Sequence, residues 1–139
     1  MSVATRLLTA IDRLRPPLTA HAHCDLPCGV YDPAQARIEA ESVKAVQEKY
    51  QSSDDETFRQ RAIQIKEERA DLVKHHLWVL WTDYFKPNHL ETYPQLHDLF
   101  WQATKEAGAA KKSVDPAQGE KLLGLIGEID KIFWETKQA

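Results

Sequence analysis

Residues 53–85 read SDDETFRQRAIQIKEERADLVKHHLWVLWTDYF, and this segment predicts one long helix. Ser53 precedes Glu56 by three residues, which is a capping box with acidic residues in the first turn. Apolar residues follow at helical spacing, namely Phe58, Ala62, Ile65, Leu72 and Val79. Lys86-Pro87-Asn88 closes the helix. About 30 continuous residues would measure about 45 Å at the helical rise per residue.

Three further helix starts flank this stretch. Asp32-Pro33-Ala34-Gln35 places Asp at the N-cap and Pro at the first helical position, and Asp115-Pro116 repeats the arrangement. Tyr93-Pro94 opens another helix, which the segment 108–113 closes. The expected apolar stripes are Ile38, Ala45 and Val46; Leu96, Leu99, Phe100 and Ala103; and Leu122, Leu125, Ile126, Ile129 and Phe133. The sequence therefore predicts an all-α, up-down-up-down four-helix bundle over 32–139.

Composition excludes several classes of protein. The chain has 139 residues, a length that suits one domain, with 42% hydrophobic and 28% charged residues. A formal charge of −3 does not favour nucleic-acid binding, which needs a basic face. No apolar run approaches the roughly 18 residues of a membrane span. We expect neither a nucleic acid nor a membrane as partner.

The first 22 residues resemble a removable leader. Ala20-His21-Ala22 has the small-x-small pattern of a processing site, after a short amphipathic helix that Pro16-Pro17 ends. A secretory signal also needs an uninterrupted apolar stretch of about 7–15 residues, which charged residues break here. We predict a leader over 1–22 that a processing protease cuts between Ala22 and His23. A helix docked permanently on the body remains the alternative.

Residues 23–33 read HCDLPCGVYDP and hold both cysteines of the chain, Cys24 and Cys28. Pro27 and Gly29 bracket Cys28, which predicts an irregular hook over 23–31. Thiolates with an imidazole select Zn, Cu, Ni or Fe. A disulfide would be strained in so small a loop, and a thioredoxin-like pair would have two residues between its cysteines. Two inert structural cysteines remain possible.

Cleavage after Ala22 would complete the metal site. It makes the α-amine of His23 a ligand beside its own imidazole. The amine, the Cys24 backbone nitrogen and the two thiolates can then lie in one plane, which suits Ni(II) or Cu(II). The imidazole is left to approach from above that plane.

The run at 23–33 resembles the nickel hook of nickel-containing superoxide dismutase. The similarity continues through 74–77, 79–81, 83–87 and 129–136, and so covers essentially all of 23–139. The resemblance implies a cytoplasmic bacterial enzyme that converts superoxide to oxygen and hydrogen peroxide. It further implies a homohexamer of four-helix bundles with one nickel ion per subunit.

The resemblance also implies a ligand set. The metal ligands would be the amine of His23, the backbone nitrogen and sulfur of Cys24, and the sulfur of Cys28. The His23 imidazole would be an axial ligand in the oxidised state.

Five more residues gain roles from the same resemblance. Glu39 and Arg69 would orient the His23 imidazole. Tyr31 and Asp25 would line the approach to the metal, with Tyr84 behind Tyr31. Together with the three metal ligands, Tyr31 is the expected catalytic residue, because either Tyr31 or an ordered water could supply a proton to the peroxide.

Other polar and aromatic residues have simpler explanations. Four histidines include no His-x-x-x-His pair, so we interpret them as structural: His75, His76, His89 and His97. We interpret four tryptophans as core or subunit-interface residues: Trp78, Trp81, Trp101 and Trp134.

Two rival functions remain. One is a nickel-storage protein without turnover, and the other is a helical oligomer with inert cysteines. The leader carries three Arg and one Asp, so the chain without it has a charge of −5. An enzyme with an anionic substrate would therefore depend on local positive potential.

Overall fold

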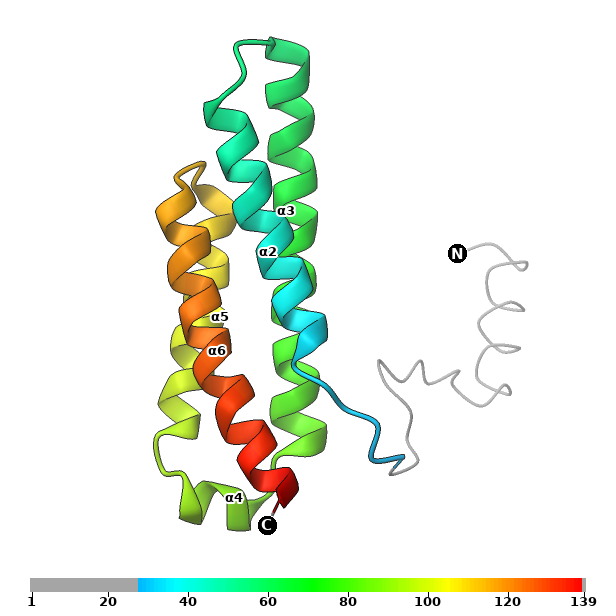
Figure 1. Ribbon diagram of the computed structural model, residues 1–139, viewed down its shortest axis with the longest axis vertical. Coiled ribbons are helices and arrows are strands. Elements are labelled where there is room, and N and C mark those ends of the chain that lie inside the picture. The colour runs from blue at the N-terminus through cyan, green and yellow to red at the C-terminus, as the bar shows by residue number, and fades with distance from the viewer. Residues whose placement is uncertain (1–27, 139) are drawn as a thin grey trace, which may run out of the picture.

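Four long antiparallel helices form the bundle in the computed structural model, which describes residues 28–138. The helices are α2 (Ala34–Gln51), α3 (Glu56–Val79), α5 (Leu96–Lys112) and α6 (Pro116–Gln138). They alternate in direction, and the short α4 (Pro87–Thr92) crosses one end of the bundle (Figure 1). Residues 28–138 contain no strand. The predicted all-α, up-down-up-down bundle is confirmed.

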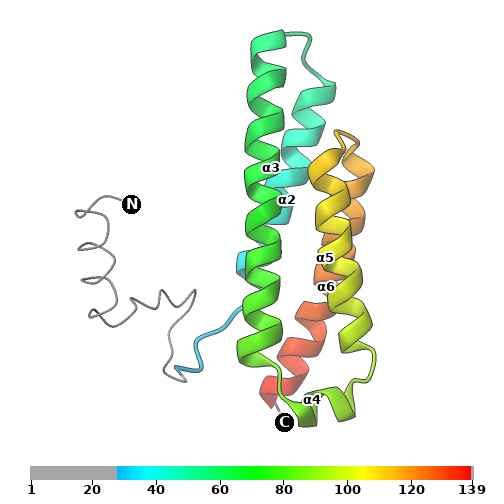
Figure 2. The ribbon, with the colours of Figure 1, turned by 180° about the vertical axis from the view of Figure 1, so that it is seen from behind.

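The four long helices pack around a single core. Helix α2 contacts α3 and α6, and α5 contacts the same two helices, so α2 and α5 lie diagonally opposite each other. Figure 2 shows the bundle from behind, with α3 running the length of the molecule. The largest fully buried apolar side chains are Phe133, Leu77, Leu96, Leu122, Ile126 and Ile129.

Side-chain caps start the helices close to where the sequence predicts. The Asp55 carboxylate accepts hydrogen bonds from the backbone nitrogens of Thr57 (2.9 Å) and Phe58 (3.3 Å), so Asp55 is the N-cap in place of Ser53. Asp32 accepts from the nitrogen of Ala34 at 2.8 Å. Asp115 accepts from that of Ala117 at 2.9 Å. The predicted Asp115-Pro116 start is confirmed, whereas α2 begins one residue later than predicted, at Ala34, with Pro33 at its N-cap.

The predicted core face of α2 and much of that of α3 are wrong. Ile38 and Ala45 are exposed on α2, and Phe58 and Ile65 are exposed on α3. The buried positions are instead Ala36, Ala40, Val43 and Gln47 on α2, and Ala62, Lys66, Ala70, Val73 and Leu77 on α3. Small side chains let these two helices approach closely, which leaves larger apolar residues outside. The predicted stripes of α5 and α6 are confirmed, with only Leu125 half-buried.

A wide turn follows α3 that the sequence does not predict. Residues Leu80–Tyr84 form one π-helical turn, closed by a 3.0 Å hydrogen bond from the nitrogen of Phe85 to the carbonyl of Leu80. Such turns insert an extra residue and occur often at functional sites.

The next two helices begin near the predicted positions. Pro87 ends the long helical segment as predicted, and it also begins α4. Helix α5 begins at Leu96, just after the predicted Tyr93-Pro94 start. Among residues 28–138, no helix combines the length and the apolar character needed to cross a membrane.

Candidate metal centre

The described part of the predicted hook leads directly into α2. Cys28 is exposed, and Gly29 has φ of 71°, a left-handed conformation that favours glycine. The segment lies at the end of the bundle where α6 ends (Figure 1). The other predicted ligands, His23 and Cys24, and also Asp25, lie outside the described residues. Within 28–138 no three His, Cys, Asp or Glu side chains gather into a metal site.

Two tyrosines lie side by side where the hook meets the bundle, Tyr31 in the hook and Tyr84 in the π-helical turn. The ring centroids of Tyr31 and Tyr84 are 5.7 Å apart, and the rings are tilted by 53°. The π-helical turn carries Tyr84 onto Phe133 of α6, with centroids 4.4 Å apart. His89 stacks against Tyr84 at 5.7 Å. The hook tyrosine therefore contacts a ring that the core itself holds in place.

The Tyr84 hydroxyl has a defined direction. Its oxygen lies 2.7 Å from the Thr136 hydroxyl oxygen, and Thr136 donates to the carbonyl of Phe133 at 2.6 Å. A threonine hydroxyl has a single proton. Because that proton goes to Phe133, Tyr84 is the donor to Thr136.

Glu39 and Arg69 form an ion pair between α2 and α3. The Arg69 Nη1 lies 3.2 Å from Oε2 and 3.4 Å from Oε1 of Glu39. The Glu39 side chain is 17% exposed and that of Arg69 is 37% exposed. This partial burial fixes the carboxylate more firmly than a surface pair would. The structure thus brings together the two residues that were expected to orient the His23 imidazole.

Histidines near these groups are held by ring and backbone contacts. His75 and His76 meet edge to face at 5.4 Å, and burial, with the charge of His75, lowers the pKa of His76. Burial and the charge of Lys86 lower the pKa of His89, which accepts a hydrogen bond from the Lys86 nitrogen at 3.2 Å. His97 meets the Trp81 ring at 5.6 Å.

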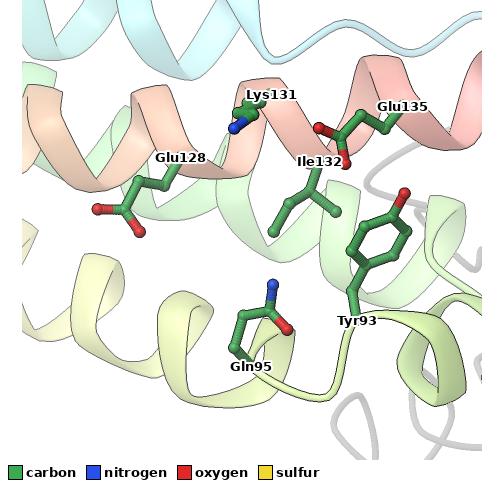
Figure 3. A pocket seen from close by; sticks show the side chains of 6 residues that line it. All are labelled: Tyr93, Gln95, Glu128, Lys131, Ile132 and Glu135. Atoms are coloured by element: carbon green, nitrogen blue, oxygen red, sulfur yellow. The ribbon is translucent and has the colours of Figure 1, made fainter.

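One cavity lies apart from all of these residues. It has a volume of about 280 Å³ and opens beside the start of α5 (Figure 3). Tyr93 points its hydroxyl toward Glu135 across this cavity (Figure 3). Burial, and then the interaction with the Glu135 carboxylate, raise the pKa of Tyr93. None of the predicted site residues lines it. The lining residues are Tyr93, Gln95, Glu128, Lys131, Ile132 and Glu135.

Comparison with known proteins identifies the family. A family model described as nickel-containing superoxide dismutase matches residues 18–137. The chain belongs to the nickel-containing superoxide dismutase family. It is 65% identical over 124 residues to the nickel superoxide dismutases of Streptomyces seoulensis and Streptomyces coelicolor (strain ATCC BAA-471 / A3(2) / M145), an alignment that covers 89% of this chain and 95% of each relative.

Solved structures agree with this assignment. A native nickel superoxide dismutase structure matches with a TM-score of 0.82 and 67% identity, over 84% of this chain and 100% of the solved one. Other solved relatives, at 65 to 66% identity, are variants in which one residue is replaced. The replaced residues are a histidine that begins their chain, an aspartate two residues after it, and a tyrosine eight residues after it. As a member of this family, the chain is an oxidoreductase whose cofactor is nickel.

Proposed function

We propose that this superoxide dismutase works by Ni(II)/Ni(III) cycling in the hook 23–31, and that proteolytic removal of the leader 1–22 completes that hook. The observation that carries the proposal is a spacing. His23, Asp25 and Tyr31 repeat the spacing of the histidine, aspartate and tyrosine replaced in the solved relatives, whose chains begin at the histidine. The 84% share of this chain in the structural match corresponds to about 117 residues, the length of 23–139.

The donor chemistry fits nickel. Cys28 is exposed and precedes a left-handed glycine, and its thiolate is a ligand that nickel accepts. Imidazole nitrogen, an amine and thiolates together would provide the donor types that a nickel ion accepts. The residues that would hold the ion are His23, Cys24 and Cys28. When bound, nickel supplies the one-electron couple that alternately oxidises and reduces superoxide.

The residues around the hook would orient a ligand and supply a proton. Glu39, fixed by Arg69, would accept the second imidazole N–H of His23, as carboxylates do for metal-bound histidines. Reduction of superoxide to hydrogen peroxide consumes protons. Tyr84 directs its own proton to Thr136. The immediate donor in this proposal is therefore Tyr31 or a water beside it, with Asp25 lining the same approach.

A homohexamer is part of the same proposal. Large apolar side chains are exposed on the isolated chain, among them Val30 beside the hook (79%), Trp78 (52%) and Trp101 (57%). Trp78 and Trp101 border a groove of about 190 Å³ between α3 and α5. Contiguous exposed apolar surface of this kind is typical of protein–protein interfaces. We propose that such surfaces are buried between subunits, and that the enzyme is cytoplasmic.

Two chains that differ by one residue test the role of cleavage. One begins at His23 and the other at Ala22, so only the first has a free amine on the histidine. We expect the first to bind one nickel per subunit and to remove superoxide near the diffusional ceiling, about 10⁸–10⁹ M⁻¹s⁻¹. We expect the chain that begins at Ala22 to be at least about a hundredfold less active than the chain that begins at His23. Equal turnover and equal spectra for the two chains would refute the leader proposal.

A further substitution separates this proposal from its rivals. In the chain that begins at His23, Cys28→Ser should abolish both stoichiometric nickel binding and turnover. Unchanged nickel content would indicate inert cysteines. Bound nickel without turnover in the parent chain would indicate a storage protein.

A further inference from the structure

A lysine at the end of α6 contacts the hook backbone. Lys137 Nζ donates a hydrogen bond of 3.3 Å to the carbonyl oxygen of Gly29, 108 residues away in the chain. Gly29 directly follows Cys28, the described cysteine of the hook. The contact therefore joins the last turn of the bundle to the residue next to a predicted nickel ligand.

The same lysine is held from a second side. Its Nζ lies 5.0 Å from the ring centroid of Tyr84 and 5.5 Å from that of Phe133. A cation over an aromatic face is attracted to it, and the stem of a lysine packs on apolar surface. The Tyr84 ring is in turn fixed by Phe133 and Thr136. Lys137 therefore contacts the hook while it also packs on two aromatic rings that belong to the bundle.

A position near the C-terminus of a helix favours lysine for an independent reason. Cations there interact well with the helix dipole, and this alone would explain a lysine in the last turn. It does not explain the bond to Gly29. The left-handed conformation of Gly29 sets the direction of the following peptide, and the lysine meets the carbonyl that results.

We propose that Lys137 is a positioning residue that anchors the hook through the Gly29 carbonyl and so sets where Cys28 lies relative to the Tyr31–Tyr84 pair. Its relevance to catalysis rests on the proposed function, because that proposal places nickel in the hook. Three ammonium donors on a flexible stem let one lysine bind a carbonyl and remain over two rings. Removal of the ammonium should leave the bundle folded and the hook less ordered.

The first test needs no metal. Backbone ¹⁵N relaxation of the metal-free full chain reports the order of the Gly29 and Val30 amides on the ps–ns timescale. We compare Lys137→Met, which keeps the stem, with Lys137→Arg, which keeps donors and charge. Lys131→Met is the matched control, since Lys131 is an exposed lysine of the same helix that lines the separate cavity. The expected result is a fall in the order parameter from about 0.85 to below about 0.6 in Lys137→Met alone.

The second test uses the nickel-loaded processed enzyme. Transfer of nickel to excess EDTA should be roughly three- to tenfold faster in Lys137→Met, which is the effect of one lost hydrogen bond. Lys137→Arg should stay within about twofold of the parent, and Lys131→Met should match the parent. Turnover is not the readout, because the lysine charge also acts on the approach of an anion.

The outcomes separate this inference from the proposed function. Unchanged order at Gly29, or unchanged nickel transfer, in Lys137→Met overturns the anchoring role even if the enzyme dismutates superoxide. Lost order at Gly29 in Lys137→Met, together with no nickel binding by the processed parent enzyme, supports the anchor and refutes the proposed function. If Lys137→Met does not fold, the same two measurements on Lys137→Gln decide between these results.

Discussion

The Glu39 carboxylate and the Arg69 guanidinium, thirty residues apart in the chain, meet across α2 and α3 with Oε2 and Nη1 3.2 Å apart. Helices α2 and α3 pack against each other, and the Glu39 side chain is more buried than that of Arg69. Arg69 contacts both carboxylate oxygens through one nitrogen, and a carboxylate has about four lone-pair sites, so it has the capacity to accept an imidazole N–H as well. This arrangement is what the orientation of the His23 ring would require.

Glu39→Gln should therefore impair catalysis more than metal binding. The amide keeps the shape of the side chain but removes the charge that pairs with Arg69. We expect turnover of the nickel-loaded enzyme to fall about 10- to 100-fold, the range for loss of an outer partner of a metal ligand. Metal analysis should still give one nickel per subunit.

Glu41→Gln is the matched control for this substitution. Glu41 lies on the same helix and pairs with Arg37 at 2.8 Å, but both partners are exposed. An exposed pair contributes little, so turnover should stay within about twofold. Equal effects of the two substitutions would show that the Glu39–Arg69 pair has no special role.

The hydrogen bond between Tyr84 and Thr136 should be measurable as a coupling energy. The free energy of unfolding of the parent, Tyr84→Phe, Thr136→Val and the double variant forms a double-mutant cycle. We expect a coupling of about 0.5–1.5 kcal/mol, because Thr136 is the acceptor of the Tyr84 proton. Urea unfolding provides the four values.

Thr92→Val controls for the loss of a threonine hydroxyl. Thr92 donates to the carbonyl of Asn88 at 3.0 Å on an exposed surface. Its removal should show no coupling to Tyr84→Phe. A coupling near zero for the Tyr84–Thr136 cycle as well would contradict the assigned hydrogen bond.

Local signals in the sequence predict the helix starts well. The Asp-Pro pairs at 32–33 and 115–116 act within three residues, so their hydrogen bonds do not depend on the rest of the fold. The hook is also a local pattern, since Cys28 and Gly29 are neighbours. The contact between the rings of Tyr31 and Tyr84, 53 residues apart in the chain, leaves no such local pattern.

Features that depend on partners distant in sequence were not predictable. The core face of α2 rests on Ala36 and Ala40, whose small side chains give a weak periodic signal next to Ile38. Lys66 is buried on α3 because its Nζ donates to the carbonyl of Ala110 (3.2 Å) and to that of Lys111. Neither this contact nor the one between Lys137 and Gly29 leaves a trace in local sequence.

The lowered pKa of His76 predicts a pH dependence of stability. Burial, and then the charge of His75, lower this pKa from its ordinary value of 6.5. Between 6.5 and the folded pKa, the unfolded chain binds a proton that the folded chain does not. Stability therefore falls as pH drops through this window and levels off below it.

Urea unfolding between pH 5 and pH 7.5 measures this contribution. His76→Gln removes the titrating group, so the variant should lose less stability than the parent as pH falls. His75→Gln removes only the charge of His75 and leaves the burial of His76, so it should reduce the pH dependence of stability by a smaller amount. Parallel curves for the parent and His76→Gln would exclude His76 as a source of acid sensitivity.

Gly119 permits the close approach of α6 to α2. A Cβ atom at this position would lie 2.6 Å from Oε1 of Gln47 and 2.8 Å from Cα of Lys44. The second atom is backbone, so the helices themselves would have to separate. Gln47 would also be displaced from the carbonyls of Ala110 and Ser113, to which its amide donates. Gly119→Ala should therefore cost about 1–3 kcal/mol of the free energy of unfolding.

Gly127→Ala, on the same helix, should have the opposite sign. A Cβ at Gly127 meets nothing within 4 Å, and alanine is the better helix former. We expect it to stabilise the protein by about 0.5–1 kcal/mol. Urea unfolding of both variants separates the loss of close packing from the intrinsic helix preference. If Gly119→Ala were as stable as Gly127→Ala, the contact between α2 and α6 would not depend on the missing side chain.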